Sequence, residues 1–228
     1  MDVVLVALCA ALVIAVLLAR RERRRLAIRL EAAELRYASE LEHLSGLALH
    51  DALTGLPNRV LLQDRLRHAL SARSRRGGHV GVLFLDLDGF KAVNDGYGHG
   101  VGDEVLATIA SRLRGAVRAG DTPARLSGDE FVVVCEGVDD LAALHGAAGR
   151  LESAITAPIV FGDRVICLGV SVGAVLYEPD ARETPSHAAA RLIAAADGRM
   201  YEVKRARQLR LMEMGVLNQA AARSAPRG

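Results

Sequence analysis

The stretch Arg125-Leu126-Ser127-Gly128-Asp129-Glu130-Phe131, followed by three valines, is the part of the chain from which the fold can be derived. Its Ser-Gly pair separates residues 123–126 from the β-branched run at residues 131–134, and this pattern predicts a hairpin with a turn at Ser127-Gly128. Two adjacent carboxylates follow, which favours a hard cation held by carboxylate oxygens. Asp and Gly are also ordinary turn residues, so these seven residues alone favour a solvated turn. The other motifs decide between the two interpretations.

The chain has 228 residues, which suits one domain of ordinary size with accessory segments. Hydrophobic residues make up 51% of it, enough for a core, and the net charge is only +2. Positive charge concentrates near both ends, so no basic surface covers the whole domain and nucleic acid is not expected as a partner. Cys9, Cys135 and Cys167 form no CxxC pair, which argues against a disulfide framework or a zinc site and fits a reducing compartment.

Residues 3–19 (VVLVALCAALVIAVLLA) carry no charged or strongly polar side chain. At ~1.5 Å of rise per residue, this run is at the short end of what spans a bilayer. An Arg-rich block begins at Arg20, and such a block favours the cytoplasmic side. We therefore expect residues 1–19 to be a single transmembrane anchor in the inner membrane, with the N-terminus outside and the remainder in the cytoplasm. A cleaved signal peptide would carry its positive charges before the apolar run, and a buried core helix would seldom be apolar on every face.

Residues 20–50 form a basic juxtamembrane segment and a predicted connecting helix. Apolar side chains recur at heptad positions a and d, with Glu34 as the one polar break; they are Ala27, Leu30, Tyr37, Leu41, Leu44 and Ala48. This spacing is typical of a short parallel coiled coil, and an amphipathic helix packed on its own domain is the alternative. Either structure would link the membrane to the domain and hold two copies side by side.

A second group of carboxylates follows residues 80–85, whose near-continuous apolar character predicts a central strand buried on both faces. The run ends in Asp86-Leu87-Asp88, and alternation places Asp86 and Asp88 on one face with Leu87 on the other. Carboxylates at the end of a buried strand are suited to binding a metal ion. The alternative is that Asp86 caps the next helix.

The segment after this strand predicts a nucleotide-binding region. Residues 89–95 indicate a short helix whose first N–H groups could face a phosphate, with Lys91 adding positive charge. The Gly-rich residues 96–103 are expected to form a shaped loop, and a long helix opens at Asp103. An amide and a carboxylate, Asn94 and Asp103, could together satisfy the donor and acceptor groups of guanine.

The other predicted elements complete an α+β pattern. They are helices at residues 58–73, 139–155 and 184–207, and strands at residues 131–135, 159–161 and 165–175. Asn58 is the expected N-cap of the first of these helices. Lys204 lies near the expected end of the last helix, where its charge would favour the helix dipole. The basic tail, residues 208–228, is expected to be loosely ordered.

Taken together, several blocks in a fixed order resemble the GGDEF domain of the diguanylate cyclase family, over about residues 51–207. The blocks are DALTGLPNR (51–59), LDLDGFKAVNDGYGHGVGDEVL (85–106), RAGD (118–121), RLSGDEF (125–131), SVG (171–173) and MYEVKRA (200–206). The resemblance implies an α+β fold like the palm of nucleotidyl polymerases and class III nucleotide cyclases, with helices against a mainly antiparallel sheet. It also implies conversion of two GTP into cyclic di-GMP and two pyrophosphates, by a homodimer in which each subunit brings one GTP.

The resemblance assigns roles to individual residues of this chain. The residues implied to hold a Mg²⁺ or Mn²⁺ ion are Asp86, the carbonyl of Leu87, Asp129 and Glu130, and Asp129 and Glu130 are also the implied catalytic carboxylates. The implied substrate contacts are Phe90, Lys91 and Lys204 for phosphate, Asn94 and Asp103 for guanine, and Gly128 as a further contact. Arg118 and Asp121 match the RxxD site, where product binds and inhibits. From spacing alone, Arg118 and Asp121 could also simply pair with each other.

Two positions depart from the family pattern. Ser127 replaces the first Gly of the signature, where Gly can supply a positive φ and a close approach for the nucleotide, and we expect activity to be retained. Gln208 stands where an Arg would contact phosphate, and Arg205 or Arg207 is the candidate substitute. The alternatives to a membrane-tethered cyclase are a weak or inactive domain that senses cyclic di-GMP or GTP, and a membrane scaffold. Control is expected from dimerisation through residues 3–48 and from feedback at the RxxD site.

Overall fold

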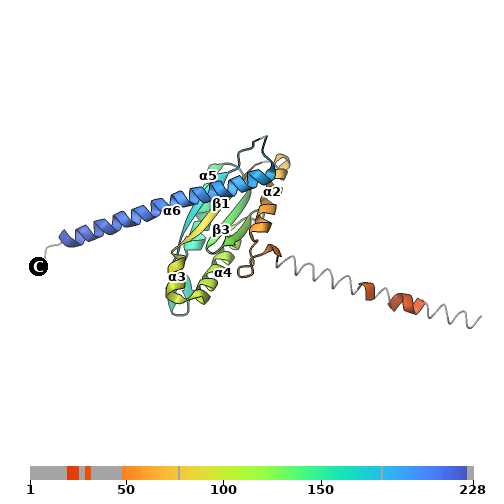
Figure 1. Ribbon diagram of the computed structural model, residues 1–228, viewed down its shortest axis with the longest axis horizontal. Helices are drawn as coiled ribbons and strands as arrows, with labels where there is room; N and C mark the ends of the chain where they lie inside the picture. The colour runs from red at the N-terminus through yellow and green to blue at the C-terminus, as the bar shows by residue number, and fades with distance from the viewer. Residues whose placement is uncertain (1–19, 26–28, 32–47, 77, 181, 225–228) are drawn as a thin grey trace, which may run out of the picture. The chain divides into compact units, whose positions relative to one another are not determined.

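The computed structural model describes residues 20–25, 29–31, 48–76, 78–180 and 182–224 (Figure 1). The chain divides into two units, residues 1–48 and residues 49–228. In the first unit, residues 20–25 and 29–31 are helical. The expected transmembrane anchor and most of the expected coiled coil lie outside the described residues. Within the described ranges, no helix is both long and apolar enough to cross a membrane.

The second unit combines helices with one main antiparallel sheet. Its elements are α2 (Arg59–Arg76), β1 (His79–Asp88), α3 (Phe90–Tyr97), α4 (His99–Ala116), β2 (Thr122–Ser127), β3 (Glu130–Val138), α5 (Leu141–Thr156), β4 (Ile159–Phe161), β5 (Arg164–Ile166), β6 (Gly169–Leu176) and α6 (Pro185–Ser224). The main sheet has the strand order β2-β3-β1-β6, and all its neighbours are antiparallel. The expected α+β fold with a mainly antiparallel sheet and flanking helices is confirmed.

β1 is the central strand that its apolar run predicts, and its side chains alternate between two cores. Leu87 and the other odd-numbered leucines pack with α4 and α5. Val82 and Phe84 pack on the opposite face with α2 and α6, which lie side by side there (Figure 1). Asp86 and Asp88 continue this second face, since each is ion-paired with a side chain of α6. The alternation predicted for the end of the strand is confirmed.

β2 and β3 form the expected hairpin, and its turn is Gly128-Asp129, one residue later than predicted. Gly128 has a φ of 46°, a conformation that glycine adopts without a Cβ penalty. Phe131 and the following residues to Cys135 are buried between the two cores. Because a one-residue slip would exchange the side chains that face the two cores, the packing of both cores fixes where the hairpin turns.

The loop expected at residues 96–103 is wrong, because α4 already begins at His99. The break between α3 and α4 is the single residue Gly98, whose φ of 85° ends α3. Gly102 lies within α4 for a steric reason: a Cβ on Gly102 would overlap Oδ1 of Asn94 and would lie 3.1 Å from its Cγ. The glycine therefore brings the Asn94 side chain against α4.

The strand expected at residues 165–175 is two strands. β5 ends at Ile166 and pairs with β4, from which it is separated by a turn at Gly162 with a φ of 59°. β6 begins at Gly169 and pairs with β1, where it forms an edge of the main sheet. The local hairpin turn takes β5 away from the main sheet, so only the second half of the predicted strand joins it.

α6 continues to Ser224, so the predicted helix end near Arg207 is wrong, and residues 208–224 of the expected loosely ordered tail are helical. Residues 199–214 contain no Gly or Pro and are rich in Arg, Leu, Met and Glu, which favours a continued helix. Lys204 therefore lies inside α6 rather than near its end. Its position depends on how α6 packs on the sheet, and the helix dipole has little influence there.

Candidate active site

Four polar residues lie in register across one end of the main sheet. Glu130 of β3 is paired with Ser127 of β2 on one side and with Asp86 of β1 on the other, and Asp86 is paired with Ser171 of β6. Directly opposed residues of antiparallel strands point to the same face, so the two carboxylates are close neighbours. Like charges in this position repel each other. This end of the sheet therefore favours a bound cation.

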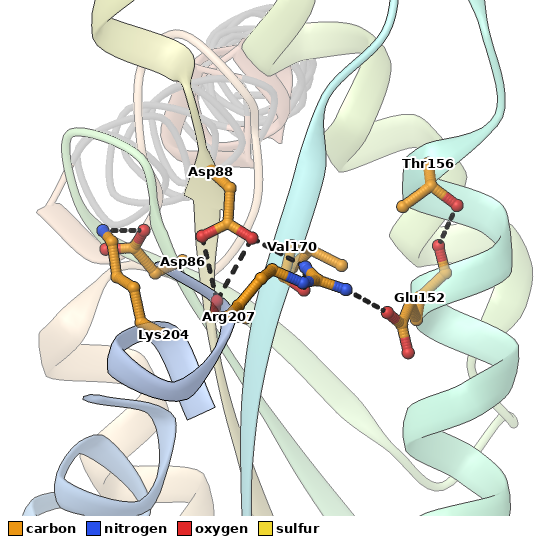
Figure 2. A network of polar contacts seen from close by, with 8 residues as sticks. Asp86, Asp88, Glu152, Thr156, Val170, Lys204 and Arg207 are labelled. Atoms are coloured by element: carbon orange, nitrogen blue, oxygen red, sulfur yellow. Dashed lines mark hydrogen bonds and ion pairs between the residues drawn. The ribbon is translucent and has the colours of Figure 1, made fainter. Parts of the chain in front are cut away.

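The Lys204 ammonium supplies one positive charge to this end of the sheet. Its Nζ lies 2.5 Å from Oδ1 of Asp86, whose carboxylate is almost buried (Figure 2). Burial by itself lowers the pKa of Lys204, but the hydrogen bond to Asp86 and the charges of Asp86, Asp129 and Asp88 outweigh it, and the net pKa is raised. Lys204 therefore stays protonated beside Asp86, which together with Glu130 forms the pair that we call the carboxylate row.

Asp129 adds a further carboxylate in the hairpin turn, next to this end of the sheet. Its carbonyl accepts a hydrogen bond of 3.3 Å from the N–H of Leu87, which ties the turn to the end of β1. Burial raises the pKa of Asp129 and the charge of Asp86 adds to this, while a backbone N–H, Lys204 and Arg125 act in the opposite direction. The net pKa of Asp129 is therefore raised mainly by burial, and the neighbouring Asp86 charge contributes less.

Arg125 holds the turn in place, a role that the sequence alone does not reveal. Its Nε and Nη2 donate to the carbonyl of Gly128 at 3.0 and 2.8 Å, and its Nη1 donates to Oδ1 of Asp51 at 2.9 Å. Asp51 also accepts hydrogen bonds from Thr54. Burial raises the pKa of Asp51, but these hydrogen bonds outweigh it and the net pKa is lowered. Asp51 and Arg125 are 74 residues apart in the chain, so no spacing pattern could have linked them.

Arg207 forms a second ion-pair network beside Lys204 (Figure 2). Its Nη1 lies 2.7 Å from Oδ2 of Asp88 and donates to the carbonyl of Val170, and its Nη2 lies 3.0 Å from Oε1 of Glu152. Ser171 donates its hydroxyl to the same Asp88 carboxylate at 2.9 Å. Arg207 was a candidate to replace the phosphate contact missing at Gln208, but its guanidinium is engaged in joining α6 to β1, β6 and α5.

Four of the expected nucleotide contacts lie on α3 and α4. Phe90 is buried in the core, so only its backbone N–H, at the first position of α3, is placed to meet a phosphate. Lys91 is exposed beside it. Asn94 lies against Gly102, the residue before the exposed Asp103. Asn94 therefore packs against the turn of α4 that carries Asp103.

The expected product-binding residues lie at the opposite end of β2 from the turn. β2 has six residues, so roughly 20 Å of strand separates them from Gly128. The carboxylate of Asp121 accepts hydrogen bonds from the backbone N–H groups of Arg118 and Glu136, at 3.1 and 3.3 Å. The alternative of a side-chain Arg118–Asp121 pair does not hold, because the Arg118 guanidinium is exposed and has no ion pair within the described part of the chain.

A hollow of about 350 Å³ lies elsewhere, along the outer edge of β6 between α5 and α6. Its lining includes His145, Arg199 and Glu202 together with the edge of β6. The carboxylates at the end of β1, the hairpin turn and Lys204 do not line it. We therefore place the candidate active site at the end of the sheet and not in this hollow.

A comparison with curated proteins gives two specific relatives. The chain is 41% identical over 204 residues to the bifunctional diguanylate cyclase/cyclic di-GMP phosphodiesterase MucR of Pseudomonas aeruginosa, covering 89% of this chain and 28% of MucR. It is 39% identical over 177 residues to the diguanylate cyclase TpbB of the same species, covering 77% of this chain and 40% of TpbB. The chain thus spans well under half the length of either relative.

Among solved structures, a sensory box/GGDEF family protein from Caulobacter crescentus matches with a TM-score of 0.63 and 41% identity, covering 69% of this chain and 99% of that one. The GGDEF domain of TpbB matches with a TM-score of 0.61 and 39% identity, covering 68% of this chain and 88% of that one. In a comparison with protein families, residues 48–210 match the family described as "Diguanylate cyclase, GGDEF domain". This match covers most of the chain and includes the row of carboxylates, the hairpin turn and Lys204, and the chain therefore belongs to the GGDEF domain family of diguanylate cyclases.

Proposed function

We propose that this protein is a diguanylate cyclase that joins two GTP molecules into cyclic di-GMP and releases two pyrophosphates. The observation that carries the proposal is the Asp86–Glu130 pair across β1 and β3, with Lys204 beside it and Asp129 in the adjoining turn. Two relatives whose names state this activity, MucR and TpbB, support it. In each of the two steps, the 3′-oxygen of one GTP loses its proton and bonds to the α-phosphorus of the other, and the bond from that phosphorus to pyrophosphate breaks.

A homodimer is part of the proposal because the product is symmetric. Each GTP contributes one attacking 3′-oxygen and one α-phosphate, so two copies of the same site facing each other would serve both bond-forming steps. One copy of the carboxylate row binds one triphosphate. A single chain would therefore bind GTP but would not close the ring.

The donors at the end of β1 fit Mg²⁺ or Mn²⁺, and GGDEF cyclases generally use divalent metal ions. Mg²⁺ is usually held by one or two carboxylates, substrate phosphates and water. Asp86, the carbonyl of Leu87, and Asp129 or Glu130 match that set. Among the described residues, no three or more His, Cys, Asp or Glu side chains gather around one point, so substrate phosphates would complete the coordination. A bound ion would neutralise the triphosphate and lower the pKa of the attacking hydroxyl.

The remaining residues would hold and orient the substrate. The Lys204 ammonium, which is ion-paired with Asp86, is within the site to receive a phosphate oxygen, and Gly128 has no side chain that would block a nucleotide. The first N–H groups of α3, at Phe90 and Lys91, have no partner within the helix and suit a phosphate. Asn94 and Asp103 would bind the guanine edge.

Turnover of GTP by the full-length purified chain tests the proposal. Incubation with GTP and Mg²⁺ should yield cyclic di-GMP and two equivalents of pyrophosphate, and Asp129→Ala should abolish the product while the protein stays folded. A dimeric sample that forms no cyclic di-GMP would contradict the proposed activity. If that sample bound cyclic di-GMP tightly and lost the binding in Arg118→Ala, the domain would be a sensing module instead.

Product feedback at Arg118 and Asp121 is the regulatory part of the proposal. The exposed Arg118 guanidinium is suited to a phosphodiester, and Asp121 fixes the local backbone. Added cyclic di-GMP should inhibit the wild-type enzyme and leave Arg118→Ala active. Equal inhibition of both proteins would show that product acts elsewhere.

We also propose that residues 1–19 anchor the protein in the inner membrane, with the N-terminus outside and the GGDEF domain in the cytoplasm. The apolar run at residues 3–19 and the Arg-rich block after it support this. The full chain should sediment with membranes, and a variant lacking residues 1–19 should not. Recovery of both in the same fraction would contradict the anchor. Deleting residues 1–48 should weaken dimerisation and activity together.

A further inference from the structure

Ser127, the residue that departs from the family signature, is hydrogen-bonded to the carboxylate row. Its Oγ donates to Oε2 of Glu130 at 2.6 Å. The two residues are also cross-strand partners, next to the irregularity between Arg125 and Ser127 in β2. Among the described residues, positive φ values occur at glycines alone, and in this turn the residue is Gly128. Ser127 therefore has no left-handed strain that would make it a poor substitute for Gly.

The length of this hydrogen bond is that of an O–H···O⁻ bond to an ionised acceptor, which is stronger than a bond between neutral groups. It uses Oε2 and leaves Oε1 of Glu130 without a bond to Ser127. A glutamate side chain has several rotatable bonds, and binding an ion normally costs the freedom of these bonds. The hydroxyl removes part of that freedom before any ion arrives, and neither Gly nor Ala could do so.

The effect of the Ser127–Glu130 hydrogen bond depends on the order of the residues across the sheet. Glu130 stands between Ser127 and Asp86, so its carboxylate is drawn by the hydroxyl on one side and repelled by Asp86 on the other. Without the hydroxyl, repulsion would favour conformations of Glu130 that point away from the site. The hydroxyl counteracts this and keeps the carboxylate beside the turn.

We propose that Ser127 is a positioning residue, which presets the Glu130 carboxylate for a divalent cation and so raises the affinity of the site for that cation. The inference rests on the proposed function for the identity of the site. It assigns Ser127 no contact with the substrate, and its effect passes through Glu130. Replacing Ser127 by Ala or Gly should therefore weaken metal binding, while Thr, which retains the hydroxyl, should preserve it.

Calorimetric titration of the full chain with Mn²⁺, without nucleotide, tests this. We expect Ser127→Ala and Ser127→Gly to bind Mn²⁺ about 10-fold more weakly than the wild type, the loss of one hydrogen bond to a charged group. Ser127→Thr should stay within about 2-fold of the wild type. Ser111→Ala, on the exposed face of α4, serves as the control. The melting temperatures of all variants without metal should agree, because Ser127 is exposed.

Kinetics separates positioning from a general loss of activity. In Ser127→Ala, the Mg²⁺ concentration for half-maximal rate should rise about 10-fold, while kcat at saturating Mg²⁺ stays near that of the wild type. Equal or tighter Mn²⁺ binding by Ser127→Ala, loss of binding in Ser127→Thr, or a wild type that binds no Mn²⁺ would each overturn the inference. If the Mn²⁺ pattern holds but no protein forms cyclic di-GMP, the proposed function fails and the positioning role stands.

Discussion

Replacing Gly173 by Ala should both destabilise the domain and displace Lys204. Gly173 lies on β6 where α6 crosses it, and a Cβ there would lie 2.9 Å from Cα of Met200 and closer still to the carbonyl of Ala196 and the N–H of Met200. All three atoms belong to the backbone of α6, so no side-chain rotation can relieve the overlap. α6 would have to move away from the sheet by about 1.5–2 Å to restore ordinary contact distances of about 3.5–4.0 Å to all three atoms.

The loss of folding stability can be estimated from the core that this movement disrupts. Ala196 and Met200 are buried in the core between α6 and the sheet, and overpacking such a core costs about 3 kcal/mol at the upper end of its usual range. For a domain of this size, that corresponds to a fall in melting temperature of roughly 6–12 °C. Lys204 is one turn beyond Met200, so its 2.5 Å contact with Asp86 would also be lost. A displacement of this size in an active site can reduce the rate about 10²-fold.

Thermal unfolding followed by circular dichroism, together with the GTP turnover assay, measures both effects. Gly198→Ala is the matched control, because it makes the same Gly-to-Ala change in α6, the helix that Gly173 contacts, at an exposed position with no atom within 4 Å. The control should gain about 0.5–1 kcal/mol, since Ala favours a helix over Gly. A Gly173→Ala variant that melted with the wild type and retained its rate would refute the account of how α6 carries Lys204.

Three further predictions concern residues around the site. Gly102→Ala should push the Asn94 amide aside and raise the KM for GTP about 10-fold with little change in melting temperature; an unchanged KM would separate Asn94 from substrate. Arg125→Ala removes the hydrogen bonds to Gly128 and Asp51 and should cost about 2 kcal/mol, roughly 4–8 °C, in a thermal melt, which an unaltered melt would contradict. The folded pKa of Asp51 is lowered, so its stabilisation exists above its unfolded pKa and is lost as the pH falls through the folded one. The excess stability of the wild type over Asp51→Asn in urea should therefore be full at pH 7 and shrink below about pH 4, and a pH-independent difference would refute it.

The sequence was sufficient where short-range patterns govern structure. The apolar run before Asp86 predicts the central strand because period-2 alternation fixes which face each carboxylate takes. The hairpin is predicted, with its turn placed one residue too early, because Gly and a β-branched run mark a hairpin. These two patterns do not by themselves place Asp86 and Glu130 at the same end of the sheet, because pairing between distant strands is not encoded in local spacing. Only the family resemblance brought the two residues together.

The features that were missed depend on tertiary contacts. Arg125 and Asp51 come together across 74 residues, and no local rule anticipates such a pair. The glycines after Tyr97 suggested a loop, but only Gly98 leaves the helical conformation, while Gly102 makes room for Asn94. The hydrogen bond from Ser127 to Glu130 required the register of β2 against β3, which a turn motif does not set to within one residue.

The most direct measurement is the formation of cyclic di-GMP from GTP and Mg²⁺ by the full-length wild-type chain and by Asp86→Asn. Asn keeps the shape of Asp86 but removes the charge that faces Glu130 across β1 and β3. We expect the wild type to form cyclic di-GMP and the folded variant to form at least about 10²-fold less, since carboxylate ligands of a catalytic metal supply several kcal/mol of transition-state stabilisation. Product formation by Asp86→Asn at the wild-type rate would contradict the assignment of this end of the sheet as the active site.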